Sequence, residues 1–371
     1  ITVLPCSDLD RNLTFLTVHR RKRMAMLADI VDVVIGVDTH KHTHTAAAVN
    51  TAGAVLEHVT EATDPDGYAA LLALADRHAS LRVWAIEGAN SYGAGLARFL
   101  TDRGEWVIEL DRPARPTRRN GAKSDQIDAV RAARDALARE HLTVPRGDNE
   151  RAALAARLTA RRSAVEAATD AQRQLHALVV TAPEVLRGRL RGKTTTEMIR
   201  VCARLRVDAR WDLLTRETAI VLRNLAQRTR HLHTEARHHE HAILTIVRNW
   251  RPDLLNVAGI GPIVAATVLC AWSHPGRIRS DAAFAMLAGT APIPASSGLT
   301  NRHRLNRSGD RQLNRAIHTI MLTRWRLDPA THAYAAHRRT QGKTDREIKR
   351  CLKRYIARQL YRQLENPPTT P

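Results

Sequence analysis

The chain has 371 residues, of which 44% are hydrophobic, and carries a formal net charge of +21, so we expect two or three folded domains and a polyanionic partner, foremost nucleic acid. No apolar run reaches the ~20 residues of a membrane span, and the four cysteines are too far apart for a zinc knuckle or a disulfide framework. These features exclude a membrane protein and a secreted disulfide scaffold, and they favour a cytoplasmic protein.

Residues 1–30 are predicted to be a basic N-terminal extension. Five consecutive residues from His19 to Arg23 are basic or histidine, and Met24 follows them directly. The segment is either a disordered tail or the product of an overlong translation start, and we favour the second interpretation.

Residues 31–145 alternate between short β-rich runs and helical stretches. Thr51-Ala52-Gly53 supplies a hairpin turn between the second and third strands. The order βββαβαβα is that of an RNase H-like (RuvC-like) α/β domain, in which the first strand lies centrally beside the fourth. We predict strands over 33–38, 43–50, 54–60, 82–86 and 106–110, and helices over 67–78, 92–102 and from 124 past 136.

Acidic residues fall at the ends of these predicted elements. Asp38 ends the first strand, Glu87 follows the fourth, and Asp125 and Asp128 share a face at the start of the last helix. Carboxylates are ligands that Mg²⁺ prefers, and two ions ~4 Å apart can stabilise an in-line phosphoryl displacement. We therefore predict that these acids form a catalytic Mg²⁺ site in which Mn²⁺ can substitute. Asp111 is left out because arginines surround it.

Residues 147–250 lose all strand signals and are predicted to be helical. Apolar residues recur at helical spacing in two stretches, which predicts two long helices paired as a coiled coil. Pro183 and the segment 188–193 interrupt the register, which indicates an elaborated tip. A solvated helical spacer is the alternative. The apolar series are Leu154, Leu158, Val165, Ala168 and Leu175, and then Leu222, Leu225, Leu232, Ala236 and Ile243.

Residues 251–340 are predicted to form a compact helical domain, which opens with a glycine turn. Gly259 and Gly261 match a helix-hairpin-helix turn, in which backbone amides approach a nucleic-acid phosphate. An ordinary packing turn is about equally favoured on local sequence.

A small-residue loop later in this domain ends in Ser297-Gly298. A hydroxyl nucleophile needs nearby cations, and arginines follow this serine. Ser296 competes for the role, and a plain surface loop is the commoner meaning of such a sequence. The predicted nucleic-acid contacts of the whole chain are Arg118, Arg119, Lys123, Gly259, Gly261, Arg302, Arg304, Arg307 and Arg311.

Residues 341–371 are predicted to form a basic amphipathic helix and a tail. The helix carries one apolar stripe, and the chain from Glu365 to Pro371 is predicted to fray as a disordered tail. The stripe comprises Ile348, Leu352, Tyr355, Ile356 and Leu360.

Seven short motifs follow one another between residue 33 and residue 361. In this order they resemble those of the DEDD transposases of bacterial insertion sequences, the insertion sequence 110 family, which join an RNase H-like domain to a C-terminal serine transposase domain. The motifs are Gly36–Lys41, Ile86–Tyr92, Lys123–Ala129, Ala258–Gly261, Ala288–Pro292, Ser296–Gly298 and Ser308–Leu313.

The resemblance implies a DNA recombinase of the bacterial nucleoid, guided by a structured bridge RNA. It implies that Asp38, Glu87, Asp125 and Asp128 bind Mg²⁺ and that Ser297 attacks DNA to form a covalent phosphoserine. It also implies a homo-oligomer, from dimer to tetramer, in which the serine of one subunit completes the acidic site of another. Two alternatives stay open: a RuvC-like nuclease that uses metal-activated water, and a decayed protein that only binds nucleic acid.

Overall fold

The computed structural model describes residues 26–110, 124–140, 142–147, 149–295 and 303–367. The chain divides into two compact units, residues 1–146 and residues 147–371. Within the described ranges, no helix is both long and apolar enough to cross a membrane.

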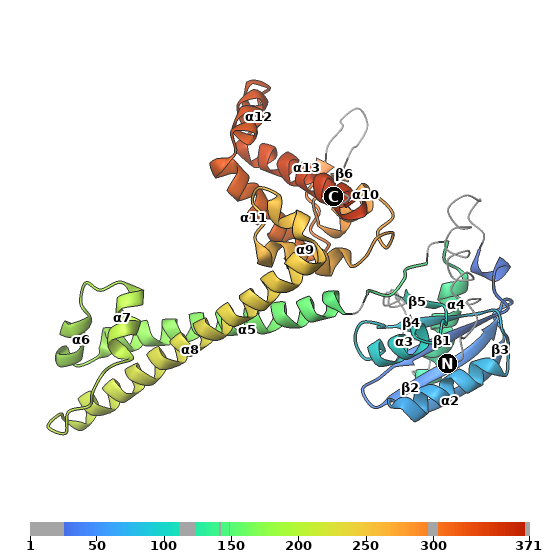
Figure 1. Cartoon of the computed structure of the whole chain (residues 1–371), viewed down its shortest axis with the longest axis horizontal. Helices are drawn as coiled ribbons and strands as arrows, with labels where there is room; N and C mark the ends of the chain where they lie inside the picture. The colour runs from blue at the N-terminus through green and yellow to red at the C-terminus, as the bar shows by residue number, and fades with distance from the viewer. Residues whose placement is uncertain (1–25, 111–123, 141, 148, 296–302, 368–371) are drawn as a thin grey trace, which may run out of the picture. The chain divides into compact units, whose positions relative to one another are not determined.

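The N-terminal unit is built on a five-stranded mixed sheet in the order β3-β2-β1-β4-β5 (Figure 1). The central strand β1 (Val33–Thr39) pairs antiparallel with β2 (Thr43–Asn50) and parallel with β4 (Arg82–Glu87). The outer strands are β3 (Val55–Ala62) and β5 (Val107–Leu110). The predicted RNase H-like order, with the first strand beside the fourth, is therefore confirmed.

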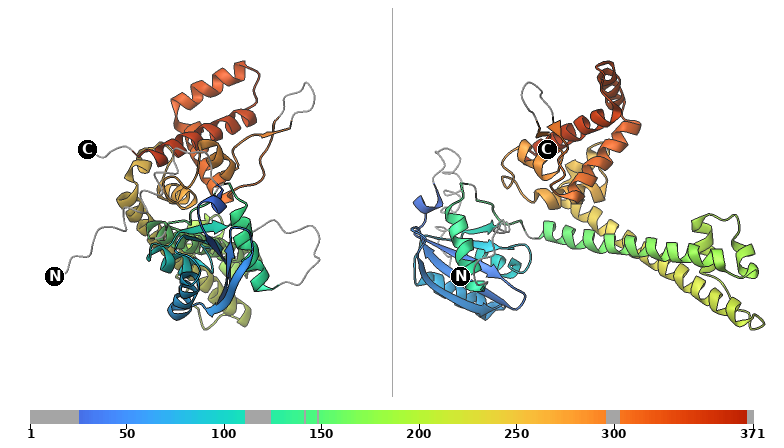
Figure 2. Two further views of the ribbon diagram at one scale, coloured as in Figure 1. Left: turned by 90° about the vertical axis from the view of Figure 1, so that its right-hand side faces the viewer. Right: turned by 180° about the vertical axis from the view of Figure 1, so that it is seen from behind.

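Helices cover both faces of this sheet, which explains why its central strands read as continuous apolar runs. On one face, α2 (Pro65–Asp76) and α3 (Ala94–Thr101) supply the leucines of one hydrophobic core. On the other face, the alanines of α4 (Asp125–Leu137) and the short 3₁₀ helix η1 (Leu27–Asp29) form a second core (Figure 2).

The second unit begins with a helical hairpin (Figures 1 and 2). The helices α5 (Glu150–Thr181) and α8 (Leu213–Trp250) lie side by side, and α6 (Glu184–Leu190) and α7 (Thr195–Cys202) form the tip. The predicted apolar series needs one correction: Val165 is 38% exposed. The buried α5 positions around it are the alanines Ala164, Ala168 and Ala171, whose small side chains let α8 approach closely.

The rest of this unit is a helical cluster around one core that includes Phe284, Ile317 and Leu360. Two details differ from the sequence prediction. Tyr355 is 54% exposed and lies outside the buried stripe of the last helix, and Glu365 is not frayed, because its carboxylate accepts hydrogen bonds from Trp272 Nε1 (2.7 Å) and the Gly276 amide (2.9 Å). The elements are η2 (Pro252–Asn256), α9 (Pro262–Trp272), α10 (Asp281–Leu287), β6 (Ile293–Pro294), β7 (His303–Arg304), α11 (Arg311–Leu327), α12 (Pro329–Thr340) and α13 (Asp345–Glu365).

Candidate functional site

A glycine on the central strand lets α4 approach the sheet. A Cβ atom at Gly36 would lie 2.1 Å from the Ala129 carbonyl oxygen and 2.5 Å from the Ala133 amide nitrogen, so no larger residue fits there. Because α4 packs directly on β1 at this point, the first turn of the helix lies beside the end of the strand. This contact brings Asp125, the first residue of α4, to Asp38.

The ends of β1 and β4 are held together at the same edge of the sheet. The parallel register pairs Val37 with Ile86, so Asp38 and Glu87 are the next residues on neighbouring strands. Thr39 Oγ1 donates a hydrogen bond of 2.8 Å to the Glu87 carbonyl oxygen. The sheet therefore places both acidic residues where the strands end.

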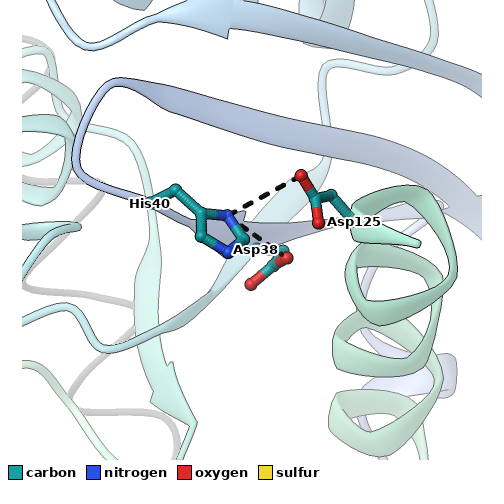
Figure 3. Close-up of side chains that lie close together, drawn as sticks. All are labelled: Asp38, His40 and Asp125. Atoms are coloured by element: carbon teal, nitrogen blue, oxygen red, sulfur yellow. Dashed lines mark ion pairs between the residues drawn. The ribbon is translucent and has the colours of Figure 1, made fainter. Parts of the chain in front are cut away.

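Three side chains converge at this edge (Figure 3). One possible ligand atom from each of Asp38, His40 and Asp125 lies within 4.8 Å of the others. His40 Nδ1 is 3.6 Å from Asp38 Oδ2 and 3.9 Å from Asp125 Oδ2. Sequence reasoning missed His40, although its place two residues after Asp38 was a usable signal, because alternate residues of an extended chain point to one side.

Asp38 is the acid of the site whose pKa is raised. Its side chain is only 14% exposed, and burial raises the pKa of its carboxyl group. His40 opposes this rise, whereas the negative charges of Asp125, Asp128 and Glu87 add to it. All four predicted acids therefore lie close enough to interact electrostatically.

Asp128 and Glu87 lie outside the tight group of three. Asp128 accepts a hydrogen bond of 2.8 Å from Arg131, one turn further along α4, so part of its charge is already compensated. The N-terminus of α4 favours carboxylates in its first turn, and Ser124 caps it by accepting a hydrogen bond from the Ile127 amide.

The chemistry of this group fits a divalent metal ion. Carboxylate oxygens dominate the donor set, and hard cations such as Mg²⁺ or Mn²⁺ prefer such ligands. The charges that raise the pKa of Asp38 are of the sign that a cation would compensate. Asp38 and Asp125 would be its first ligands, with His40 able to supply a nitrogen.

Several sequence-predicted contacts lie outside the described residues. These are Ser297 with its neighbour Ser296, and Arg118, Arg119, Lys123 and Arg302. The short strands β6 and β7 pair at either side of the segment that carries Ser297. After β7, the side chains of Arg304, Arg307 and Arg311 are exposed.

The glycine turn between η2 and α9 has a mixed character. Gly259 has a φ of +85°, and a Cβ there would lie 3.2 Å from the Ile320 carbonyl oxygen, so this glycine is needed for packing against α11. A Cβ atom added at Gly261 would meet no described neighbour within 4 Å, and this glycine opens the N-terminus of α9 beside a pocket of about 460 Å³. Packing therefore explains Gly259, whereas phosphate binding at the open Gly261 stays a prediction.

Comparison with known proteins places each of these regions in a transposase family. The family of DEDD transposases of IS110 elements matches residues 35–182, which include all four acids. The family described as "Transposase IS116/IS110/IS902 family" matches residues 252–336, which include the glycine turn and Ser297. The "Insertion element IS110 uncharacterized 43.6 kDa protein" of Streptomyces coelicolor is 33% identical over 94 residues, which are 25% of this chain and 23% of that protein.

Proposed function

The chain belongs to the IS116/IS110/IS902 family of transposases, and we propose that it cuts and rejoins DNA strands through the acidic site of its N-terminal unit. The observation that carries this proposal is the convergence of Asp38 and Asp125 within 4.8 Å at the edge of an RNase H-like sheet. An acidic edge of this kind suits phosphoryl transfer, because it can hold the cations that a phosphodiester needs near it.

In this mechanism the residues of the site have separate roles. Asp38, Asp125 and Glu87 hold and orient the divalent cation, which we propose is Mg²⁺, with Mn²⁺ able to substitute. When bound, the ion supplies charge stabilisation to the phosphodiester under attack. Asp128, which Arg131 holds at 2.8 Å, orients the first turn of α4 and adds negative charge behind the ligands.

Ser297 is the proposed nucleophile. Its hydroxyl loses a proton and forms an Oγ–P bond with the scissile phosphate, while the P–O bond to one deoxyribose breaks and that sugar oxygen takes up a proton. The number of phosphoester bonds stays constant, so a second strand end can reverse the step without an external energy source. Arg304, Arg307 and Arg311, exposed after β7, are proposed to contact the DNA or RNA backbone.

Guidance and assembly belong to the same proposal. A structured RNA would select the element ends and the target DNA by base pairing, and the net charge of +21 suits a protein that binds both nucleic acids. We propose a homo-oligomer, from dimer to tetramer, in which the serine of one subunit serves the acidic site of another.

A covalent-adduct assay tests this function. The substrate is labelled DNA that carries the element ends, offered together with transcripts of the flanking non-coding DNA. We expect a protein–DNA adduct in wild-type protein and in Ser296→Ala, and none in Ser297→Ala, while all three bind DNA alike. Cleavage without any adduct would instead assign the hydrolytic, water-using reaction, and an adduct in Ser297→Ala would place the nucleophile elsewhere.

A further inference from the structure

The helical unit contains a basic pocket that the proposed reaction does not use. The pocket lies between α11, α12 and α13 and has a volume of about 350 Å³, the size of a small-ligand site. Met321, Leu352 and Ile356 form its apolar lining. Its charged lining consists of arginines, with no carboxylate among the lining residues.

Two arginines of this pocket, Arg358 and Arg362, belong to a row along α13. Arg350, Arg354, Arg358 and Arg362 follow one another at four-residue spacing, which corresponds to ~6 Å of helix rise per step. Like charges at this spacing repel one another, so the row needs compensation. Asp281 compensates the middle of the row, at 3.4 Å from Arg354 and 2.8 Å from Arg358.

Arg362 is the member of the row that both lines the pocket and keeps its charge available. Its side chain is exposed and has no hydrogen-bond or ion-pair partner among the described residues. Arg324 on the opposite wall is instead held in place, because it donates to the Ala258 carbonyl oxygen (3.0 Å) and to Gln359 Oε1 (2.9 Å). The pocket thus offers two guanidinium groups that are held, Arg324 and Arg358, and one that is free, Arg362.

An exposed aromatic ring stands at the same pocket. Tyr355 lines the pocket and is 54% exposed, and its edge contact with Tyr334 (5.8 Å between centroids, 84° between planes) holds the ring. Aromatic residues are only 4% of the chain, and among the described residues only Tyr92 and Tyr355 are exposed. Packing in the core does not explain why the Tyr355 ring is exposed at this position.

We propose that the pocket binds one unstacked nucleotide of a single-stranded nucleic acid. The base would lie on the apolar lining against Tyr355, and Arg362 would pair with the adjacent phosphate. The combination fits a single strand, because its bases are free to leave the stack, whereas the bases of a duplex are not. A loop of a structured RNA and a displaced DNA strand offer the same chemistry. This inference rests on the proposed function only in supplying such strands.

Binding measurements on the full chain test the site. Labelled single-stranded RNA, single-stranded DNA of the same sequence and duplex DNA are titrated by fluorescence anisotropy. We expect Tyr355→Ala to weaken single-strand binding roughly tenfold and Tyr355→Phe to leave it unchanged, because stacking needs the ring and not the hydroxyl. The RNA and DNA arms show which strand the pocket prefers.

A matched pair of arginine variants separates the pocket from general charge. Arg362→Gln and Arg346→Gln remove the same charge from exposed positions of the same helix, but only Arg362 lines the pocket. We expect Arg362→Gln to weaken single-strand binding roughly tenfold and Arg346→Gln to weaken it less than about threefold. Circular dichroism controls for folding of each variant.

The outcomes are distinct from those of the covalent-adduct assay. Three results would each overturn the proposed nucleotide site. Arg362→Gln and Arg346→Gln could lose equal single-strand affinity, or Tyr355→Ala could leave single-strand affinity unchanged. The third is a loss of duplex affinity in Tyr355→Ala and Arg362→Gln that equals their loss of single-strand affinity. A photo-crosslink from a 5-iodouracil strand to Tyr355 would support it directly. Because none of these readouts needs strand cleavage, they test the nucleotide site independently of the proposed roles of Ser297 and the acidic residues.

Discussion

Asp38 in the N-terminal unit and Asp253 in the helical unit lie in opposite electrostatic surroundings. In the N-terminal unit, burial and neighbouring acids raise the pKa of Asp38, and its close partners are His40 and Asp125. In the helical unit, Asp253 is also shielded, but two hydrogen bonds from Arg251 and one from Gln363 hold its pKa below the ordinary value. Asp281 has a lowered pKa as well, through Arg358 and Arg354.

This difference fits the proposed roles of the two groups of acids. The chain contains 58 lysines and arginines against 37 acidic residues, so an acid that folds next to an arginine is the ordinary outcome. In the helical unit, Asp253 and Asp281 follow that pattern. Among the described residues, Asp38 and Asp125 pair with no arginine, and His40 is the basic side chain near both, which fits the proposal that a cation binds them after folding.

The largest expected effect separates the two groups by activity. Asp38→Asn, Glu87→Gln or Asp125→Asn should each reduce strand cleavage by roughly a thousandfold or more, because each removes a carboxylate from the cation site. Asp128→Asn should be milder, since Arg131 already holds that carboxylate. Asp281→Asn is the control from the helical unit, and gel assays of cleavage should show it near wild type. A comparable loss of cleavage activity in Asp281→Asn would contradict the proposed difference between the acidic site and the acids of the helical unit.

Salt dependence tests how many arginines remain available after the internal pairs are made. If about six or more phosphates are neutralised, nucleic-acid affinity should fall by about a thousandfold between roughly 50 and 200 mM salt. Filter binding across this range measures the slope. A nearly flat dependence would mean that the arginines only pair with acids or face solvent, and that the high charge mirrors composition alone.

Removing Asp253 should destabilise the helical unit. Arg251 is buried, at 8% side-chain exposure, and donates to both carboxylate oxygens of Asp253 at 2.7 and 2.8 Å. Asp253→Asn would leave this guanidinium without its counter-charge, and we expect a loss of about 3 kcal/mol in unfolding free energy. Denaturant unfolding followed by circular dichroism measures it, with the exposed Asp102→Asn as control. A change below about 0.5 kcal/mol would show that the Gln363 and Leu364 carbonyl oxygens suffice to hold Arg251.

The smallest expected effect is on the pH dependence of stability, to which Asp253 and Asp38 contribute with opposite signs. The lowered pKa of Asp253 gives stability that is present above its unfolded pKa of about 3.9 and is lost as pH falls through the folded value. The raised pKa of Asp38 gives a contribution that is present below about pH 3.9 and is lost as pH rises through its folded value. In EDTA at neutral pH, Asp38→Asn should therefore slow hydrogen exchange in β1 and β4. Faster exchange would contradict the raised pKa.

The sequence predicted the sheet, and the position of two acids at strand ends, well because both depend on simple periodicity. The strand order follows from the β-rich runs, and Asp38 and Glu87 come at strand ends whatever the details of packing. The prediction could not supply His40 as a neighbour of both Asp38 and Asp125, because that contact needs the close approach of α4 at Gly36. The sequence placed Asp128 beside Asp125 on one helix face with a milder expected role, and its pairing with Arg131 is a contact that the spacing alone did not predict.

The helical unit was harder to predict at the level of single residues. Helical periodicity placed Val165 and Tyr355 on apolar faces, but both are exposed. The helix α5 uses alanines to contact α8, and the neighbours of α13 leave Tyr355 at the edge of a pocket. Such outcomes depend on how several helices meet, which no single stretch of sequence records. Ser297 lies outside the described residues, so its role stays a prediction.

A titration with Mn²⁺, followed by electron paramagnetic resonance, tests the central claim most directly because it needs no DNA substrate. Wild-type protein, freed of metal with EDTA and dialysed, should bind Mn²⁺ at the acidic edge, and added Mg²⁺ should displace it. Asp38→Asn and Asp125→Asn should weaken this binding at least roughly tenfold, whereas Asp281→Asn should not change it. Equal Mn²⁺ binding in all four proteins, or no binding in wild type, would contradict the account.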